Sequence, residues 1–361
     1  MPTQNGIEPI PKTMRAAVYR GVNDLRMETL PVPRIGSMEL LVKVAVSGVC
    51  PTDIKKIQYG TVPPPRIFGH ETAGMIVRVG ARVRSFRVGE RVGLHHHIPC
   101  LKCHACRHRS FAQCAVYKRT GITAGFEPAG GGFAEYVRVM PFVFPGIVRI
   151  PEKNSFLEGA MLEPVNTVLK AVHRLNIQPG DFVMVVGQGP IGLMFSRVLN
   201  LRRMNVVACD LVPRRLRIAR QFGASWAFQA DEMGFLERVE RLTQGRGLDA
   251  AVIAVPSDQA VRSAQRLVRG GGQVLLFAHT RRGNDCGLDL SEICAEEKDM
   301  VGSYSADVTL QREAAELVFS GELDITKLVT NQFSLEATAA AIRLAAQPQP
   351  NSLKVVVSQH V

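Results

Sequence analysis

Hydrophobic residues in the first 150 positions form short β-branched runs that glycine and proline interrupt. Residues 40–46 and 75–79 are clear examples. Runs of this length, bounded by turn-forming residues, are typical of strands. The pattern therefore predicts an irregular all-β region from Met14 to about Pro151.

From about Asn154 onward, apolar runs alternate with stretches of helical periodicity. The predicted strands of this part are residues 182–186, 205–209, 250–255 and 273–278. Alternation at this spacing favours right-handed crossover units and a doubly wound parallel sheet. The last predicted elements are two helices and a strand, at residues 310–319, 335–346 and 353–357. We expect this tail to return to the first domain.

The predicted fold class is therefore α/β, with an irregular β domain and a parallel-sheet domain. A chain of 361 residues is longer than one hydrophobic core usually supports, which agrees with two domains. Small-molecule sites often lie between domains, so we expect the ligand in a cleft between these two.

The first strand of the parallel sheet runs directly into the sequence Gly-x-Gly-x-x-Gly. The motif and the start of the following helix contain Gly187, Gly189, Pro190, Ile191 and Gly192. The first glycine permits a tight turn, the second lets the backbone approach a pyrophosphate, and the third lets helix and strand pack closely. The helix N-terminus offers free N–H groups to phosphates. This context predicts a dinucleotide-binding site, although a glycine turn without a ligand is the structural alternative.

Asp210 ends the next predicted strand, about twenty residues after the motif. A carboxylate there accepts hydrogen bonds from a ribose diol and repels a 2′-phosphate, which favours NAD over NADP. Arg214 and Arg215 follow closely. They either contact a phosphate, which makes Arg215 a candidate cofactor-binding residue, or are solvated helix arginines.

Four cysteines lie close together in the first domain, at Cys100, Cys103, Cys106 and Cys114. Their spacing, C-x2-C-x2-C-x7-C, suits one tetrahedral zinc ion. Four thiolates leave no open coordination position, so this site is predicted to be structural. An iron–sulfur cluster is disfavoured, because the ferredoxin run places its fourth cysteine after three residues and before proline. A reduced, metal-free cluster is the remaining alternative.

A second metal site has to be assembled from distant segments, which contain Cys50, His70, Glu71 and Glu163. Each has a structural alternative: Cys50 as a small buried residue, the pair His70 and Glu71 as a polar turn, and Glu163 as a carboxylate in a first helical turn. A catalytic zinc ion needs protein ligands fixed by the fold and one exchangeable position. These residue types supply such ligands.

The formal net charge of +12 suggests a polyanionic partner at first sight. The arginines, however, are scattered along helix-like segments without interleaved aromatic residues for base stacking, so we expect no nucleic-acid partner. No stretch resembles a membrane span, and the first dozen residues do not read as a secretory signal. We expect a cytoplasmic protein whose eight cysteines are thiols or metal ligands rather than disulfides.

A further motif, G-H-E-x-x-G-x5-G-x-x-V, consists of Gly69, His70, Glu71, Gly74, Gly80 and Val83. Together with the four cysteines and the glycine motif that follow it, nearly the whole chain resembles the zinc-containing medium-chain dehydrogenase/reductase family. Glu163, in place of a second cysteine, points to the sorbitol (L-iditol) and threonine 3-dehydrogenase branch.

The resemblance implies two domains. They are a GroES-like catalytic domain (residues 1–164 and 304–361) with a structural zinc lobe at about 95–118, and a Rossmann domain (165–303). It also implies two zinc ions per chain and a homotetramer, or a homodimer.

By the same resemblance, Cys50 and His70 are catalytic zinc ligands, Glu71 is a ligand or its close neighbour, and Glu163 is the acidic counterpart of the alcohol dehydrogenases' second cysteine. Thr52 occupies the position of the hydroxyl that passes on the substrate proton, and Asp53 that of a residue orienting a ligand. Lys55 stands where many relatives have a relay histidine, and we expect it to be solvent-exposed. Pro51 replaces the usual glycine.

These features predict a zinc-dependent oxidoreductase that moves a hydride between NAD and a small secondary alcohol of polyol, cyclitol or L-threonine type. Two alternatives stay open at this point. One is a zinc-independent quinone or enone reductase of the same fold, against which Cys50 and His70 argue. The other is a non-catalytic nucleotide-binding protein.

Overall fold

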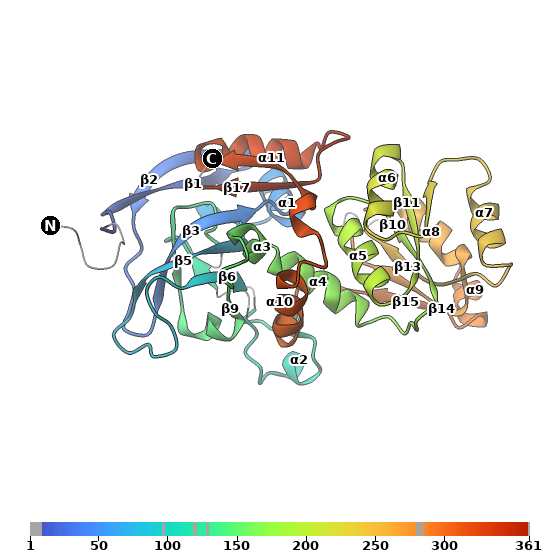
Figure 1. Ribbon diagram of the computed structural model, residues 1–361, viewed down its shortest axis with the longest axis horizontal. Helices are drawn as coiled ribbons and strands as arrows, with labels where there is room; N and C mark the ends of the chain where they lie inside the picture. The colour runs from blue at the N-terminus through green and yellow to red at the C-terminus, as the bar shows by residue number, and fades with distance from the viewer. Residues whose placement is uncertain are drawn as a thin grey trace. The chain divides into compact units, whose positions relative to one another are not determined.

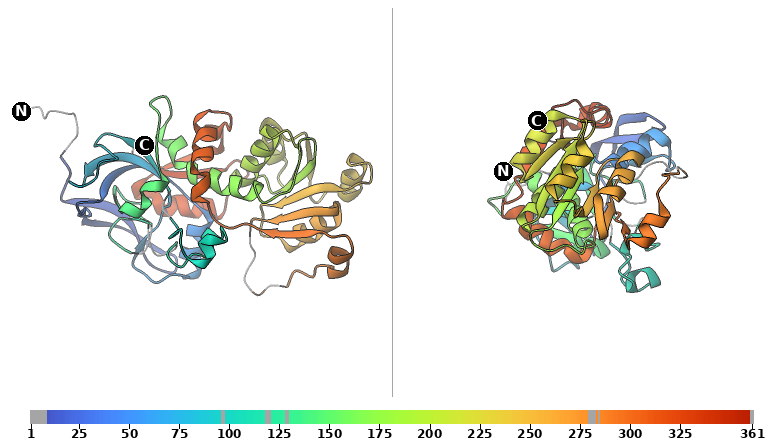
Figure 2. Two further views of the ribbon diagram at one scale, coloured as in Figure 1. Left: turned by 90° about the horizontal axis from the view of Figure 1, so that it is seen from below. Right: turned by 90° about the vertical axis from the view of Figure 1, so that its right-hand side faces the viewer.

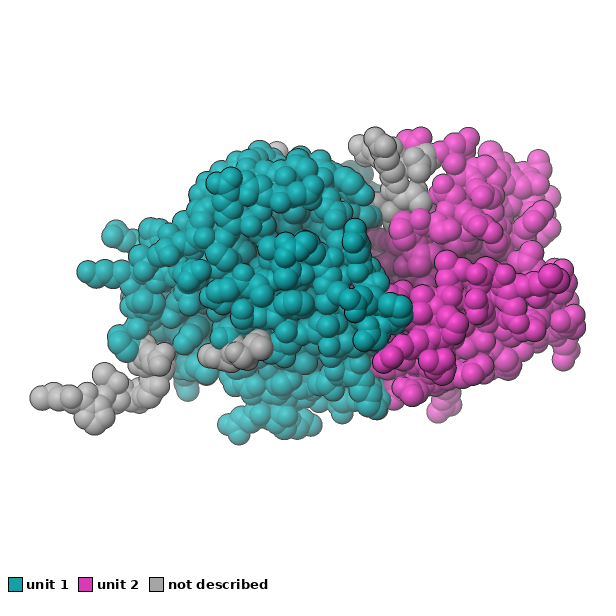
Figure 3. Space-filling view, turned by 90° about the horizontal axis from the view of Figure 1, so that it is seen from above, with its two compact units in different colours: residues 1–166, 307–361 teal, residues 167–306 magenta. Residues whose placement is uncertain are grey.

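The chain folds into two compact units. In the computed structural model, the described residues are 9–95, 98–117, 121–127, 130–278, 283 and 285–359. Unit 1 comprises Met1–Asn166 and Asp307–Val361, and unit 2 comprises Thr167–Ala306. Figure 1 shows the elements of both units, and Figure 3 colours the units separately. Residues 96, 97 and 118 of the predicted zinc lobe lie outside the described residues.

Unit 1 is built on a mainly antiparallel sheet. Across the sheet the strands are β16 (Val329–Ser334), β17 (Lys354–Ser358), β3 (Leu40–Gly48), β5 (Glu71–Val79), β6 (Arg91–His95) and β9 (Ile147–Arg149), with β8 (Tyr136–Val139) on β3 and β7 (Ile122–Thr123) on β8. A smaller sheet contains β2 (Asp24–Pro31), β1 (Thr13–Gly21) and β4 (Arg66–Ile67). The fully buried side chains of Val42, Ile76 and Val92 come from three neighbouring strands of the large sheet and form part of the core. The last strand, β17, thus lies in the middle of a sheet whose other strands are mostly made early in the chain.

The helices of unit 1 are α1 (Pro51–Tyr59), α2 (His104–Arg107), α3 (Phe156–Ala160), α4 (Leu162–Val172, which continues into unit 2), α10 (Gln311–Phe319) and α11 (Thr338–Ala346). Helix α1 follows β3 after a short turn. Cys50 is its N-cap residue and Pro51 its first helical residue. Proline suits that position because its fixed φ is helical and its missing N–H needs no partner there. Pro51 therefore starts the helix that follows Cys50.

Unit 2 contains a six-stranded parallel sheet. Its spatial order is β12 (Trp226–Gln229), β11 (Asn205–Asp210), β10 (Phe182–Val186), β13 (Leu248–Ile253), β14 (Val268–Leu276) and β15 (Asp299–Gly302). The chain winds from β10 outward to β12, then returns to β13 and winds the other way. This is the doubly wound order, in which ligands bind at the carboxyl ends of the strands where the winding reverses. The predicted α/β class with a doubly wound domain is confirmed.

The helices of unit 2 are α5 (Pro190–Leu201), α6 (Pro213–Gln221), α7 (Phe235–Leu242), α8 (Asp258–Leu267) and α9 (Leu290–Ala295). Helices α5 and α6 contact each other, as do α7 and α8. Because right-handed crossovers put the helices of the two halves on opposite faces, the pairs sandwich the sheet (Figure 2). None of the helices among the described residues has the length and apolar character needed to cross a membrane.

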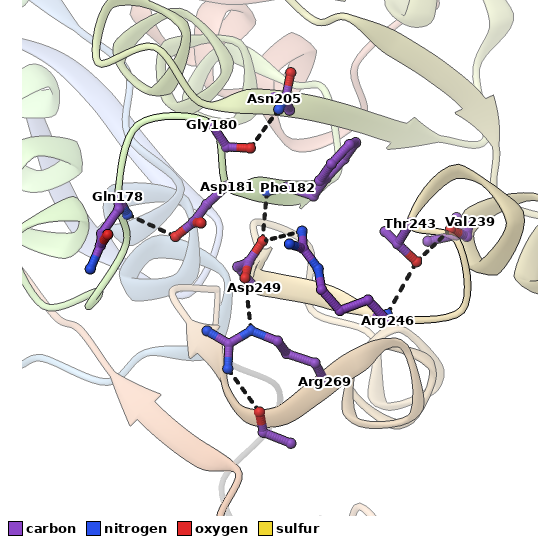
Figure 4. Close-up of polar contacts among 12 residues, drawn as sticks. Gln178, Gly180, Asp181, Phe182, Asn205, Val239, Thr243, Arg246, Asp249 and Arg269 are labelled. Carbon is purple, nitrogen blue, oxygen red and sulfur yellow. Dashed lines mark hydrogen bonds and ion pairs between the residues drawn. The ribbon is translucent and has the colours of Figure 1, made fainter.

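The amino end of this sheet is held by Asp249 in β13. Its buried carboxylate accepts hydrogen bonds from the Phe182 backbone N–H (2.9 Å), Arg269 Nε (2.7 Å) and Arg246 Nη2 (3.2 Å), as Figure 4 shows. Two guanidinium groups and one amide offset the desolvation of the charge. The network is at the opposite end of β10 from the glycine motif, so it secures the strands away from the predicted ligand site.

The region predicted to be all-β, Met14 to about Pro151, also contains the helices α1 and α2, which the short apolar runs did not indicate. The other observed elements differ from the predicted ones mainly at their ends. Strand β13 begins at Leu248, two residues before the predicted start, because the polar but buried Asp249 interrupts the apolar pattern. Each of the two predicted C-terminal helices begins with a single 3-10 turn, Val308–Leu310 before α10 and Leu335–Ala337 before α11. The strand predicted at 182–186 coincides with β10.

Candidate metal and dinucleotide sites

Three of the predicted catalytic residues converge in unit 1. Cys50 is the N-cap of α1, His70 directly precedes β5, and Glu71 is the first residue of β5. One ligand atom from each side chain lies within 4.8 Å of the others. Glu71 is buried, His70 is nearly so, and Cys50 is partly exposed. A thiolate, an imidazole and a carboxylate are the donors that zinc takes in proteins, so the residues fit a zinc ion.

The chain makes room for Glu71 with a glycine on the next strand. In the antiparallel pairing of β3 and β5, Gly48 lies opposite Glu71. A Cβ atom at position 48 would lie 1.8 Å from Glu71 Oε2. Any larger residue there would displace the carboxylate, so Gly48 belongs to the site although it has no side chain. Its role is not evident from the sequence alone.

Lys354 is a second residue that the sequence analysis missed. It begins β17, is buried, and its Nζ lies 2.7 Å and 2.5 Å from the two carboxylate oxygens of Glu71. The same ammonium donates to the Val49 carbonyl at 3.0 Å, next to Cys50. Burial lowers the pKa of Lys354, but Glu71, Cys50 and Glu163 together raise it by more, so the pKa is raised overall. A lysine inside an apolar strand, followed by three valines, was the available signal.

His70 is held by Asp53. The Asp53 carboxylate, on α1, lies 3.1 Å from His70 Nδ1 and is almost fully buried. Burial lowers the pKa of His70, but Asp53 and Cys50 raise it well above its ordinary value. Burial also raises the pKa of Asp53, but His70 reverses this effect and lowers it overall. A carboxylate on one ring nitrogen fixes the ring orientation and leaves the other nitrogen for a metal.

Glu163, Thr52 and Lys55 surround this set without belonging to it. Glu163, in the first turn of α4, is outside the group of atoms within 4.8 Å. Burial raises the pKa of the Glu163 carboxyl to about 7, His70 opposes the rise and Glu71 adds to it, which places Glu163 in their electrostatic neighbourhood. Thr52 is a half-buried residue of α1. Lys55 is half-buried and not solvent-exposed as expected, and burial lowers its pKa.

The four predicted structural ligands also converge. Cys100, Cys103, Cys106 and Cys114 place their sulfur atoms within 4.8 Å of one another, and none forms a disulfide. A tetrahedral zinc site with Zn–S bonds of about 2.3 Å requires sulfur atoms about 3.8 Å apart. Cys103 Sγ and Cys100 Sγ lie 3.5 and 3.9 Å from Cys106 Sγ. These distances fit a four-thiolate zinc site.

Backbone N–H groups stabilise the thiolate form in this lobe. The N–H of Cys103 donates to Cys100 Sγ at 3.4 Å, and that of Cys100 to Cys114 Sγ at 3.4 Å. Backbone hydrogen bonds from Lys102 and Cys103 lower the pKa of Cys100 to about 6. Burial raises the pKa of Cys106 to about 12. The lobe's hydrophobic cluster is small, with Phe111 and Tyr117 beside the cysteines, so we expect a bound metal to contribute to its stability.

The glycine motif of unit 2 has the geometry that its sequence predicts. Gly187 has φ +92°, and a Cβ there would lie 2.3 Å from Val255 Cγ1. A Cβ at Gly192 would lie 1.7 Å from the Gly187 carbonyl oxygen. At Gly189, the N-cap of α5, a Cβ would meet no described atom within 4 Å, so the backbone is accessible. Pro190 and Ile191 follow in the first turn of α5, half-buried.

Asp210 faces the same turn from the end of β11. Its Oδ2 accepts the Gln188 N–H at 2.6 Å and its Oδ1 accepts the Val212 N–H at 2.8 Å, which fixes the carboxylate. Arg215 is a half-buried residue of α6, and its Nε is buried without a hydrogen-bond partner among the described residues. The structure therefore brings Asp210 to the glycine motif, as predicted.

Family models match both units. The alcohol dehydrogenase GroES-like domain matches residues 36–152, and the zinc-binding dehydrogenase domain matches residues 190–320. A sorbitol dehydrogenase of Bacillus subtilis (strain 168) is 33% identical, and the alignment covers 96% of this chain and 98% of the relative. A sorbitol dehydrogenase of Bombyx mori is 31% identical over 91% of this chain and 94% of its own. A D-xylulose reductase A of Aspergillus oryzae is 28% identical, and the alignment covers 90% of this chain and 92% of the relative.

Solved structures agree. A zinc-binding dehydrogenase of Sinorhizobium meliloti 1021 bound to NADP has a TM-score of 0.86 at 26% identity, covering 96% of this chain and all of its own. An alcohol dehydrogenase of Escherichia coli CFT073 complexed with NADH has a TM-score of 0.86 at 25% identity and the same coverage. The chain belongs to the zinc-containing medium-chain dehydrogenases/reductases. It is an oxidoreductase of the alcohol and polyol dehydrogenase class that uses zinc and NAD(P), and the predicted family and reaction class are confirmed.

Proposed function

We propose that this enzyme oxidises a linear polyol, or a closely related vicinal diol, at a secondary hydroxyl, with NAD as hydride acceptor. The products are the ketose or ketone, NADH and a proton. The observation that carries the proposal is the convergence of Cys50, His70 and Glu71 within 4.8 Å, with Cys50 partly exposed to solvent. Three protein ligands leave the fourth position of a tetrahedral zinc ion open for substrate, in contrast to the four-cysteine lobe.

Cys50, His70 and Glu71 would hold the catalytic zinc ion, and we propose Glu163 as the neighbouring acidic residue. Zinc bound there supplies a Lewis acid that lowers the pKa of an alcohol hydroxyl. The chain's own residues then have defined tasks. Asp53 orients the His70 ring, Lys354 neutralises Glu71, and the Thr52 hydroxyl accepts the proton of the substrate hydroxyl and passes it on.

The dinucleotide would bind at the carboxyl end of β10. Gly187, Gly189 and Gly192, with Pro190 and Ile191 at the helix start, form a turn whose free N–H groups suit a pyrophosphate. Asp210 would accept hydrogen bonds from the adenosine ribose, and Arg215 is the candidate for a phosphate contact.

NAD preference depends on Asp210 in this proposal. Asp210→Ala removes the charge that repels a 2′-phosphate, so the ratio of kcat/KM for NAD to that for NADP is expected to fall by about tenfold or more. Asp181→Ala, which changes a carboxylate just before β10, at the opposite end of that strand from the glycine motif, is the control and should leave the ratio as it is. An unchanged ratio in Asp210→Ala would remove Asp210 from the cofactor site.

The polyol class is supported by the names of the relatives, which include two sorbitol dehydrogenases and a D-xylulose reductase. A panel of sorbitol, xylitol, butane-2,3-diol, an inositol and L-threonine, each with NAD, is followed by the absorbance of NADH. We expect the linear polyols to give the highest kcat/KM. Turnover of L-threonine or an inositol alone would overturn the substrate class.

Zinc analysis separates the alternatives. The proposed enzyme binds about two zinc ions per chain, a non-catalytic nucleotide-binding protein about one, and a zinc-independent quinone or enone reductase none. A homotetramer, or a homodimer, and a cytoplasmic location stay predictions from the sequence. Size measurement in solution tests the assembly.

A further inference from the structure

The chain crosses between its two units twice, and the two crossings are bonded to each other. It leaves unit 1 after Asn166, inside the continuous helix α4, and returns at Asp307. The Asn166 side chain bonds both backbone groups of Asp307. Its Oδ1 accepts the Asp307 N–H at 2.8 Å, and its Nδ2 donates to the Asp307 carbonyl at 3.0 Å. The outgoing and returning connections thus meet at the residues where the units divide.

The same face of α4 continues the pattern beyond the crossing. Lys170, one helical turn after Asn166, donates to the Tyr304 carbonyl at 2.7 Å. Arg174, in the turn directly after α4, donates to the Gly302 carbonyl. Residues four apart on a helix share a face. The side chains of Asn166, Lys170 and Arg174 therefore bond α4 and the turn after it to residues 302–307, which run antiparallel to the helix. We call this set of contacts the laced connection.

A buried polar network anchors this connection in unit 1. Asn166 Nδ2 also donates to Gln311 Oε1 at 2.9 Å, and Gln311 Nε2 donates to the Gly146 carbonyl at 3.1 Å. The His95 ring lies 3.1 Å from Gln311 Oε1. Asn166, Gln311 and His95 are at most 5% exposed. In the low dielectric of a protein interior, a hydrogen-bond network whose members all have partners favours one side-chain arrangement.

The network also ends next to the metal-ligand set. His95 in β6 is paired in register with Glu71 in β5, so the two residues are cross-strand neighbours. Glu163 lies one turn before Asn166 on α4. The laced connection is therefore joined at one end to the residues that would bind the alcohol, and it continues at the other end into the unit that carries the glycine motif.

From this arrangement we infer that Asn166 is a positioning residue for hydride transfer. Its clasp on Asp307 makes the two crossings act as one connection, and hydride transfer between the dinucleotide of unit 2 and the alcohol of unit 1 then depends on that connection. The inference rests on the proposed function, which assigns one reactant to each unit. Misplacing reactants by as little as about 1 Å can lower a rate about a hundredfold.

The test compares three variants of the full-length enzyme. Asn166→Ala removes the clasp. Asn166→Asp keeps the shape and the acceptor but places an oxygen against the Asp307 carbonyl. Asn154→Ala is the matched control, because Asn154 is another buried asparagine of unit 1 that donates to the returning part of the chain, at the Phe319 carbonyl (3.3 Å), away from the crossings.

We expect both Asn166 variants to lose about tenfold to about a hundredfold in kcat. The zinc content and the Kd for NAD should stay within about twofold of the wild-type values. The deuterium isotope effect on kcat, measured with substrate labelled at the carbinol carbon, should rise because hydride transfer becomes rate-limiting. The control should keep its kcat and isotope effect. A kcat that falls only in proportion to lost zinc or lost folded protein, or one that does not fall, would overturn the inference.

Hydrogen exchange gives a readout that needs no substrate. In the wild-type enzyme, NAD should slow amide exchange at residues 187–192 and also in β5 of unit 1. In Asn166→Ala the slowing at 187–192 should persist and that in β5 should be lost. If no alcohol is oxidised by the wild type but this transmitted protection is lost in the variant, the proposed function fails and the positioning role stands. Equal protection of β5 in both proteins refutes the positioning role.

Discussion

The two groups of metal-ligating side chains in unit 1 are built in opposite ways. The four cysteines of the lobe come from one loop between Cys100 and Cys114, with only a small hydrophobic cluster beside them. The set of Cys50, His70 and Glu71 comes instead from the N-terminus of α1 and the start of β5 in the large sheet, and Lys354 is added from the last strand. The lobe is local, and we expect it to depend on its metal, while the proposed catalytic set is long-range and depends on strand pairing.

This difference separates stability from catalysis. The lobe lies outside the strands of the large sheet, so its loss should leave that sheet paired. A change at the catalytic set, in contrast, also alters buried charges in the core. Variants of the lobe are therefore expected to act mainly on metal content and local stability. Variants of the catalytic set are expected to act on turnover, and some also on global stability.

The largest effect is expected for His70→Ala. Loss of a proposed zinc ligand should lower kcat by at least about 10³-fold, equivalent to about 4 kcal/mol of transition-state stabilisation. Zinc should fall from about two ions to about one per chain, because the lobe keeps its metal. The control His173→Ala changes an exposed histidine of unit 2. Normal activity of His70→Ala would contradict the assignment, as would loss of NAD binding together with activity.

A smaller effect, divided between stability and rate, is expected for Lys354→Met. Removing one partner of a buried ion pair leaves the Glu71 charge uncompensated and typically costs about 3–5 kcal/mol of unfolding free energy. Chemical denaturation measures this loss, and kcat should fall with it. Adding Glu71→Gln removes the orphaned charge, so the double variant should recover part of the stability. If the two substitutions are simply additive, the pair is not coupled.

The smallest effect on turnover is expected for Cys103→Ser. The lobe should lose its zinc, which leaves about one ion per chain, and kcat should stay within about threefold of the wild-type value in freshly prepared enzyme. Limited proteolysis should cut within residues 98–117, since the small cluster of Phe111 and Tyr117 does not hold the lobe alone. Loss of both zinc ions would show that the lobe and the catalytic set are not independent.

The sequence predicted the local features well for a physical reason. The cysteines of the lobe are close in the chain. The conformation of the glycine motif can be predicted from its residues, because only glycine fits at Gly187 and Gly192. The strand predicted at 182–186 contains only apolar residues and coincides with β10. Where a buried position is polar, as at Asp249, the apolar pattern failed and the strand was misplaced by two residues.

The long-range features could not be read in the same way. Nothing near Glu71 in the sequence indicates that its partner lies 283 residues later, at Lys354. Gly48 has a role only because β3 and β5 pair in one register, which places it opposite Glu71. Both residues are evident once strand order is known. The resemblance to a family supplied the catalytic set that spacing alone left open.

The position of β17 also bears on synthesis at the ribosome. Strand β3 pairs with β17 at residues 46–48, so this end of β3 lacks one neighbour while the intervening chain is made. Synthesis of the 283 residues that separate Glu71 from Lys354 takes about 15 to 60 seconds at about 5–20 residues per second. Unit 2 is contiguous and is completed during that interval. A nascent chain that stops before residue 354 would thus contain a finished nucleotide fold, a β3 end whose edge is exposed to aggregation, and a Glu71 carboxylate without its lysine.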